Sequence, residues 1–257
     1  MNRIESYEDL TDKIVGWIKD YYWDNDIKSL VVGVSGGIDS AVVSTLCAKT
    51  GLPTYVVAMP LNSTHQNTRL SDLHTKQLAE KYENVTRVEV ELSSVYDSLL
   101  HSINWWSEVQ HFDRKEFTSD ELANANTKSR IRMVTLYQIA GAKKGIVVGT
   151  GNKVEDYGIG FYTKYGDGGV DIAPIADLYK TEVRELGWHL GVMNEIIDAP
   201  PTDGLWDDGR SDEDQIGATY AELEEAMENG TGKAVDILYK FNRQNSHKMQ
   251  PIPTFKL

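Results

Sequence analysis

Four short apolar runs that alternate with longer segments of helical periodicity are the feature of this chain that most limits its fold. The runs predict strands at residues 29–34, 54–59, 85–90 and 145–149. Helical patterns lie at residues 39–49, 66–83, 93–103 and 119–143. Strands that are apolar on both faces and separated by helices are typical of a parallel sheet. We therefore expect an α/β fold, a doubly wound, Rossmann-like parallel sheet flanked by helices, with ligands at its carboxyl edge.

The rest of the chain adds helices and two irregular loops. Further helices are predicted at residues 5–23, 177–191, 212–228 (with Ser211 as N-cap) and 231–245. In the first of these helices we expect one face to carry Ile14, Trp17, Ile18 and Tyr21. Loops as long as those at 150–173 and 199–211 are usually functional. Since the chain has no repeat and no low-complexity linker, we expect residues 1–257 to form a single domain.

Composition excludes several classes of protein. The chain has 26 Lys and Arg against 39 Asp and Glu, a formal net charge of −13, which disfavours binding to nucleic acid. No apolar stretch approaches the roughly 20 residues of a membrane helix, and the first residues do not resemble a secretory signal. Cys47 is the one cysteine, so no intramolecular disulfide is possible, and it is predicted to be a small buried residue. These features predict a soluble, cytoplasmic protein without a membrane partner. The pair Trp105 and Trp106 is expected to pack in a core or an interface.

The loop after the first predicted strand carries the most specific chemistry. Its residues are Gly33, Val34, Ser35, Gly36, Gly37, Ile38, Asp39 and Ser40. Two adjacent glycines let backbone N–H groups converge, and a helix that starts near Asp39 adds its N-terminal partial charge. Ser35 and Ser40 supply hydroxyl donors, and Asp39 supplies a carboxylate for a divalent cation. The segment predicts a phosphate-binding loop with a built-in metal ligand, whereas the alternative is a simple tight turn. It matches neither GxxxxGK[ST] nor GxGxxG.

The SGGIDS sequence resembles the pyrophosphate-binding loop of the N-type ATP pyrophosphatases. These enzymes cleave ATP between its α- and β-phosphates, adenylate a substrate, and share an adenine nucleotide alpha hydrolase-like fold. Four later segments narrow the resemblance to the ammonia-dependent NAD synthetase family. They are residues 126–133, 149–155, 161–174 (followed by Leu178, Tyr179 and Lys180) and 246–248. The stretch between Glu155 and Phe161 is one residue longer than in some members.

The resemblance implies roles for individual residues. It implies that the loop Gly33–Ser40 contacts ATP together with Thr150, Lys180 and Thr202. It implies that Asp39 and Glu155 hold Mg²⁺, and that Ser35, Asp39 and Lys180 position the phosphates and stabilise charge without a covalent nucleophile. The residues that match deamido-NAD-binding positions are Arg130, Lys164, Asp171, His247 and Lys248.

The resemblance also implies an activity, the last step of NAD biosynthesis. ATP adenylates the nicotinate carboxylate of deamido-NAD and releases pyrophosphate, and ammonia then gives NAD and AMP. Family members are homodimers. Glutamine-dependent relatives carry an extra amidase domain, for which 257 residues leave no room, so free ammonia is the expected donor. We expect the segment 199–211 to shield the adenylate. Alternatives are another adenylating enzyme, such as a GMP synthetase-type subunit or a tRNA-thiolating enzyme, and a non-catalytic ATP-binding sensor.

Overall fold

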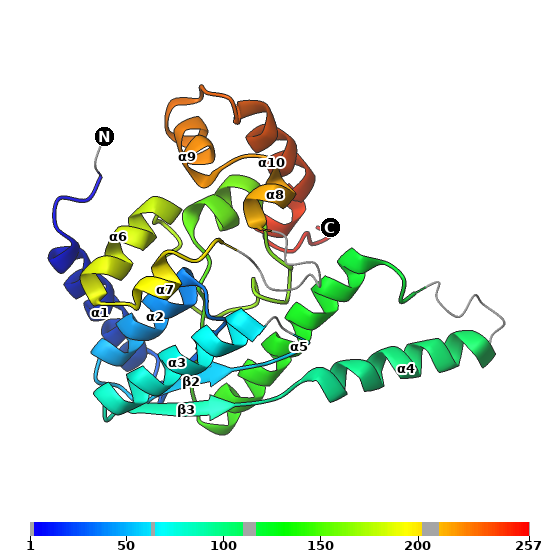
Figure 1. The fold of residues 1–257 in the computed structure, drawn as a ribbon, viewed down its shortest axis with the longest axis horizontal. Coiled ribbons are helices and arrows are strands. Elements are labelled where there is room, and N and C mark those ends of the chain that lie inside the picture. Colours follow the sequence, from blue (N-terminus) through cyan, green and yellow to red (C-terminus); the bar gives the residue numbers. More distant parts are fainter. Residues whose placement is uncertain (1–2, 63–64, 110–116, 202–210, 257) are drawn as a thin grey trace.

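The computed structural model describes residues 3–62, 65–109, 117–201 and 211–256, and its centre is a parallel sheet (Figure 1). The strands are β1 (Leu30–Val34), β2 (Thr54–Ala58), β3 (Val85–Glu89) and β4 (Ile146–Val148). Their order in the sheet is β3-β2-β1-β4, and every pair is parallel. The chain thus leaves β1 toward one edge of the sheet and later returns to its other side. This arrangement confirms the predicted doubly wound α/β fold.

Helices cover both faces of this sheet. They are α1 (Tyr7–Asp24), α2 (Ile38–Lys49), α3 (His65–Lys81), α4 (Ser93–Val109), α5 (Glu121–Ala142), α6 (Lys180–Leu190), α7 (Asn194–Ile197), α8 (Asp212–Ile216), α9 (Tyr220–Asn229) and α10 (Val235–Met249), with a π-helix, η1, at Val154–Ile159. Figure 1 shows α4 projecting from the body of the molecule beside the start of α5.

The central strand β1 explains why both faces need a cover. Leu30 and Val32 are fully buried and belong to a cluster formed with α1, α2 and α6. Val31, between them, is equally buried but packs with Val57 and Val147 against α5. Successive side chains of a strand point to opposite faces, so an uninterrupted apolar run needs helices on both sides. Full burial of each such side chain contributes roughly 1.5–3 kcal/mol.

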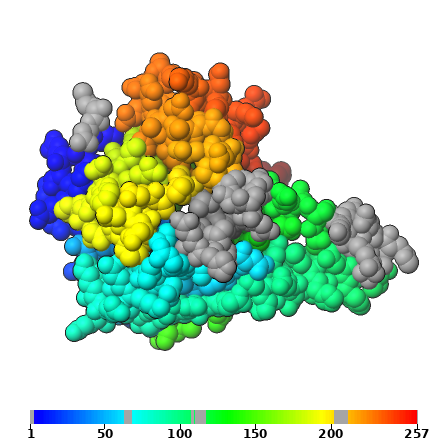
Figure 2. Space-filling view, in the orientation of Figure 1, coloured from blue at the N-terminus to red at the C-terminus, as the bar shows by residue number. Residues whose placement is uncertain are grey.

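A second, smaller apolar cluster lies beyond the carboxyl edge of the sheet. Val154 and Ile159 of η1 pack there with Ile216, Leu223 and Leu238 from α8, α9 and α10. In Figure 2 the residues of α9 and α10 form the orange and red mass above the sheet and its helices. This cluster anchors η1, and with it the residues that follow β4, against the C-terminal helices.

Three sequence predictions need correction. The predicted helix 212–228 is two helices, because Gly217 (φ +83°) ends α8 and Thr219 caps a new start at α9, while Ser211 caps α8 as predicted. Trp17 is 46% exposed and does not share the buried face of Ile14 and Ile18.

The third correction is to α4, which continues to Val109 rather than ending at residue 103. Trp105 and Trp106 on this helix are exposed in the single chain.

Cys47 is fully buried as predicted, and burial raises the pKa of its thiol to about 12. Within the described segments, no helix is both long and apolar enough to cross a bilayer.

His74 on α3 makes the stability of the protein depend on pH. Its ring is buried, Nε2 lies 3.0 Å from the Ser44 hydroxyl, and burial lowers its pKa to about 4. Between pH 6.5 and 4 the unfolded chain therefore binds a proton that the folded chain does not, so stability falls as the pH falls through this window. Between pH 7 and pH 4, the unfolding free energy of wild type should fall by up to about 3 kcal/mol more than that of His74→Gln. Urea titrations at three pH values measure this difference. His101→Gln, at an exposed position, is the control. If this variant changed the pH dependence of stability as much as His74→Gln does, the assignment to His74 would be wrong.

Candidate active site

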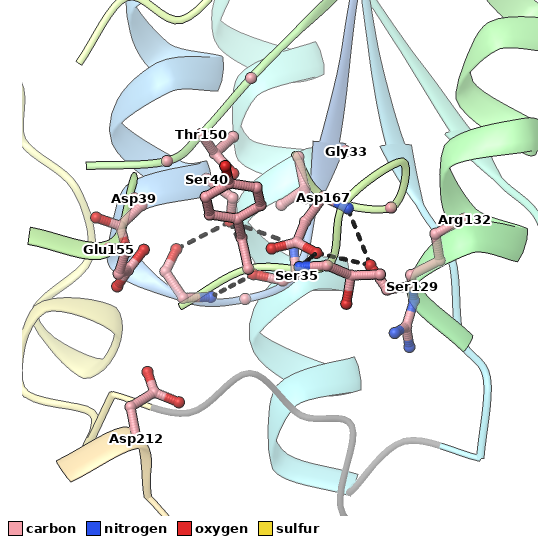
Figure 3. A pocket seen from close by; sticks show the side chains of 18 of the residues that line it. Gly33, Ser35, Asp39, Ser40, Ser129, Arg132, Thr150, Glu155, Asp167 and Asp212 are labelled. Atoms are coloured by element: carbon pink, nitrogen blue, oxygen red, sulfur yellow. Dashed lines mark hydrogen bonds between the residues drawn. The ribbon is translucent and has the colours of Figure 1, made fainter. Parts of the chain in front are cut away.

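A cavity of about 1130 Å³ lies at the carboxyl edge of the sheet, at the point where the strand order reverses. The loop after β1 and the loop after β4 lie on neighbouring strands and both line it. Doubly wound sheets bind ligands at such switch points. Figure 3 shows side chains from both loops, among them Ser35, Ser40 and Thr150, directed toward one space.

The loop between β1 and α2 is held in shape by its own serines. The Ser35 backbone N–H donates to Ser40 Oγ (3.2 Å), and the Gly37 N–H donates to Ser35 Oγ (3.2 Å). Gly36 has φ +92°, a conformation that side chains rarely adopt, which accounts for one of the two glycines. The loop leads into α2, whose first turn contains Asp39 and whose N-cap residue, Gly37, supplies no capping side chain. The unpaired N–H groups of that turn are therefore open to an anion.

A buried lysine joins this loop to two other segments. Lys180, the first residue of α6, is 3% exposed, and its Nζ lies 2.5 Å from Asp39 Oδ2 and 3.0 Å from Glu155 Oε1. Burial opposes the lysine charge, but the carboxylates of Asp39, Glu155 and Asp212 outweigh it and raise the pKa of Lys180. Burial raises the pKa of Asp39, against the pull of the lysine. The structure thus brings together three residues that the sequence placed at the phosphates and the metal.

Asn152 fixes the two carboxylates relative to one another. Its Nδ2 donates to Asp39 Oδ1 (3.3 Å), and its Oδ1 accepts from the backbone N–H of Glu155 (3.1 Å). It is fully buried, and the sequence pattern around it predicts no role for it. Thr150, two residues earlier, lines the cavity, and its hydroxyl has no protein partner in the described segments, so it is open to a ligand.

Tyr220 and Asp212 complete the cluster, and no sequence pattern singles them out. The Tyr220 hydroxyl lies 2.6 Å from Glu155 Oε1 and 3.3 Å from Asp212 Oδ2. Burial and these two negative charges raise the pKa of Tyr220, so the phenol keeps its proton at neutral pH. Asp212 belongs to α8 and Tyr220 to α9, both more than fifty residues from Glu155 in sequence, and the second apolar cluster packs these helices against η1.

The π-helix η1 adds a carboxyl group to the cavity wall. It spans Val154–Ile159, and π-helices accommodate an additional residue per turn. Its Asp156 lies against Gly151, where any Cβ would come within 2.3 Å of the carboxylate. Burial and the charges of Glu155, Asp167 and Asp39 raise the pKa of Asp156 to about 7.

Asp167 lies in the same wall of the cavity. Its carboxylate accepts from the Ser129 hydroxyl (2.8 Å) and from the Thr163 N–H (2.9 Å), while desolvation raises its pKa. Lys248 also lines the cavity and donates to the carbonyl of Tyr162 (2.7 Å). Lys248 and the carboxyl groups of Asp156 and Asp167 therefore line the same cavity as the phosphate loop.

Three of the residues predicted to bind deamido-NAD form a group on the surface, outside the cavity lining. Arg130 Nε donates to the Lys164 carbonyl (3.4 Å), and Lys164 Nζ donates to the His247 carbonyl (3.1 Å). Lys248, next in the chain, is the member of the predicted set that reaches the cavity.

Asp171 is placed differently. Its Oδ2 accepts from the Val147 N–H of β4 (2.7 Å) and its Oδ1 from the Tyr137 hydroxyl (3.0 Å), and it does not line the cavity. Thr202, expected to contact ATP, lies outside the described residues, as does most of the segment 199–211 that we expect to shield the adenylate.

The donor set fits a magnesium ion. Asp39 and Glu155 converge closely enough to share one ammonium group, and their oxygens are the ligands that Mg²⁺ prefers. Among the described residues, no group of three or more His, Cys, Asp or Glu side chains is arranged as a complete metal site. Two carboxylates completed by substrate phosphates are the usual way in which enzymes of phosphate chemistry bind Mg²⁺.

Removing the lysine should expose the electrostatic cost of this cluster. In Lys180→Met, two buried carboxylates face each other without a cation, so we expect the metal-free protein to lose about 3–5 kcal/mol of unfolding free energy. Urea denaturation in EDTA measures the change. Lys153→Met is the matched control, because its ion pair with the exposed Asp177 should contribute less than about 1 kcal/mol. Equal losses in the two variants would contradict a special role for the Lys180 cluster.

Comparison with known proteins agrees with the fold and the motifs. The family model described as NAD synthase matches residues 10–252. The NH(3)-dependent NAD(+) synthetase of Carboxydothermus hydrogenoformans is 36% identical over 247 residues, 95% of each chain. Among solved structures, the NMN synthetase of Francisella tularensis superposes with a TM-score of 0.85 at 32% identity, covering 99% of this chain and 100% of that one. The NH3-dependent NAD synthetase of Campylobacter jejuni, solved with nitrate, shares the fold, with a TM-score of 0.75 at 23% identity, covering 98% of this chain and 100% of that one. With its phosphate loop, paired carboxylates and lysine in one cavity, the chain belongs to the NAD synthase family.

Proposed function

We propose that the chain is a ligase that uses ATP and ammonia to convert deamido-NAD into NAD. The observation that carries the proposal is the cavity itself. The phosphate loop, the Asp39–Lys180–Glu155 cluster and the cationic Lys248 all line it. One cavity can therefore hold a nucleoside triphosphate and an anionic acceptor together, which a two-substrate adenylation requires.

In the first step, an oxygen of the nicotinate carboxylate attacks the α-phosphorus of ATP. A new P–O bond forms as the bond to the bridging oxygen of the β-phosphate breaks, and pyrophosphate leaves. The N–H groups at the start of α2 and the hydroxyls of Ser35 and Ser40 hold the leaving group. Lys180 uses two of its three N–H bonds on carboxylates, so the third remains for a phosphate oxygen.

In the second step, ammonia attacks the carbonyl carbon of the mixed anhydride, AMP leaves and a proton is released. Asp39 and Glu155 would hold Mg²⁺, and this ion, when bound, neutralises phosphate charge. No described side chain is needed as a covalent nucleophile, because positioning and charge stabilisation are what such transfers chiefly demand. Ammonia as the direct nitrogen donor is supported by the naming of relatives such as the C. hydrogenoformans protein, which matches this chain over 95% of both lengths.

A second candidate acceptor is nicotinic acid mononucleotide, which the same chemistry would convert to NMN. It is favoured by the likeness to the F. tularensis NMN synthetase, which covers that whole chain at 32% identity. Both acceptors present the same nicotinate carboxylate to ATP, so the residues around Lys180 serve either one.

One assay separates these possibilities. Purified protein is incubated with ATP, Mg²⁺ and either deamido-NAD or nicotinic acid mononucleotide, with ammonium or glutamine as the nitrogen source, and AMP and dinucleotide or mononucleotide products are separated chromatographically. We expect NAD and AMP in equal amounts from deamido-NAD and ammonium, and little product with glutamine. A higher kcat/KM for the mononucleotide would select the second acceptor. Nucleotide binding without product from either acceptor would reject the ligase proposal and favour an ATP-binding sensor.

We also propose that the protein is a homodimer through the projecting helix α4. Large apolar side chains on α4 are exposed, namely Val95 (50%), Leu99 (40%), Trp105 (60%), Trp106 (48%) and Val109 (50%). Val134 on the neighbouring helix α5 is 60% exposed. Apolar residues gathered on one projecting element are typical of an interface.

Sedimentation or light scattering tests the dimer. Wild type should run as a dimer of 28.8 kDa chains, and Trp105→Glu should shift the population to monomer because a charge at an apolar interface is left without a partner. Trp23→Glu is the matched control, since Trp23 is similarly exposed (67%) but lies on α1, away from α4. A monomeric wild type would reject the proposal. Equal dissociation of both variants would reject α4 as the interface.

A further inference from the structure

Tyr220 is held firmly against the metal-binding carboxylates. It is the first residue of α9, is 3% exposed, and belongs to the second apolar cluster. Its backbone N–H donates to Glu213 Oε1 (3.0 Å), and the reciprocal capping of Thr219 and Glu222 fixes the start of the helix. The hydroxyl of Tyr220 is therefore presented by a rigid element rather than by a loop.

The contacts of Glu155 are strongly one-sided. Its Oε1 accepts from the Tyr220 hydroxyl at 2.6 Å and from Lys180 Nζ at 3.0 Å. Its Oε2 has no hydrogen-bond donor in the parts of the chain that the structure describes. A carboxylate held through one oxygen by two donors keeps a defined rotamer and leaves the second oxygen open to a cation.

The ring of Tyr220 restrains the lysine as well. Lys180 Nζ lies 4.8 Å from the ring centroid, a distance at which the ammonium is attracted to the aromatic face. The Tyr220 ring thus contacts the Lys180 ammonium, while its hydroxyl contacts Glu155, which is paired with the same lysine. The single phenolic proton goes to Glu155, the nearer of its two possible acceptors, since Asp212 Oδ2 is 3.3 Å away.

We infer that Tyr220 is a positioning residue for divalent-cation binding: its hydroxyl holds Glu155 by Oε1 so that Oε2 is presented to the ion that accompanies ATP. The inference rests on the proposed function in one respect, that Asp39 and Glu155 bind a divalent cation together with the nucleotide. According to this inference, α9 orients a metal ligand although it contributes no residue to the phosphate loop. Outer hydrogen-bond partners of metal ligands typically change metal affinity by about 10–100-fold.

The test is Tyr220→Phe, which keeps the ring and removes only the hydroxyl. Mn²⁺ binding is measured by electron paramagnetic resonance in the presence of α,β-methylene-ATP, an analogue that cannot be cleaved between these phosphates. We expect Mn²⁺ to bind Tyr220→Phe about tenfold more weakly than wild type, with the melting temperature unchanged and the analogue affinity in EDTA within about twofold. In the steady state, the Mg²⁺ concentration for half-maximal rate should rise by a similar factor, while kcat at saturating Mg²⁺ recovers.

Two comparisons keep the outcome interpretable. Tyr22→Phe removes the hydroxyl of a buried tyrosine in α1, far from the cavity, and should leave Mn²⁺ affinity unchanged. Tyr220→Met, which also lacks a donor, replaces the Phe variant if that variant does not fold. Mn²⁺ affinity within about twofold of wild type in a folded Tyr220 variant would overturn the inference. If wild type itself binds no Mn²⁺ with the analogue, the proposed metal site is wrong and the inference falls with it.

Discussion

The buried ion pair of Lys180 with Asp39 and Glu155 is the interaction on which the cavity depends. It joins three segments that are distant in sequence: the start of α2, the π-helix after β4, and the start of α6. Burying an ammonium group is costly unless acceptors lie within hydrogen-bond distance. Both carboxylates therefore have to stay close to the Lys180 ammonium, and this fixes the distance between them. Two carboxylates share one ammonium, and the group keeps an excess of negative charge. The same arrangement that closes the fold therefore attracts a further cation.

The sheet explains why this cluster lies where it does. Because the chain leaves β1 toward β2 and returns through β4 on the other side, the loops after β1 and β4 separate, and the cavity opens between them. The second apolar cluster then brings α8 and α9 over this opening. The start of α2 supplies the open N–H groups and Asp39, η1 supplies Glu155, and α9 supplies the tyrosine that contacts Glu155. An acidic protein thereby creates a local site for phosphate without a basic surface.

The sequence predicted the parts of this structure that depend on local pattern. The strands were recoverable because residues such as Val31 and Val32 are apolar in succession, and the tight turn into α2 because Gly36 and Gly37 are adjacent. The break between α8 and α9 was missed, since periodicity does not register that Gly217 adopts a positive φ. Tyr220 and Asn152 were missed for a different reason. Their roles arise from contacts across the fold, as in the bond between Tyr220 and Glu155, 65 residues apart.

The positions of the basic residues and the histidine predicted to bind the acceptor bear on the distinction between a mononucleotide and a dinucleotide. Lys248 lines the cavity, whereas Arg130, Lys164 and His247 form a connected group outside its lining. A dinucleotide acceptor is longer than a mononucleotide by a second phosphate and an adenosine, so it needs additional contacts. Adenylation chemistry is common to both acceptors, so under the proposed function discrimination between them falls to groups away from the reacting atoms, and this surface group is the candidate.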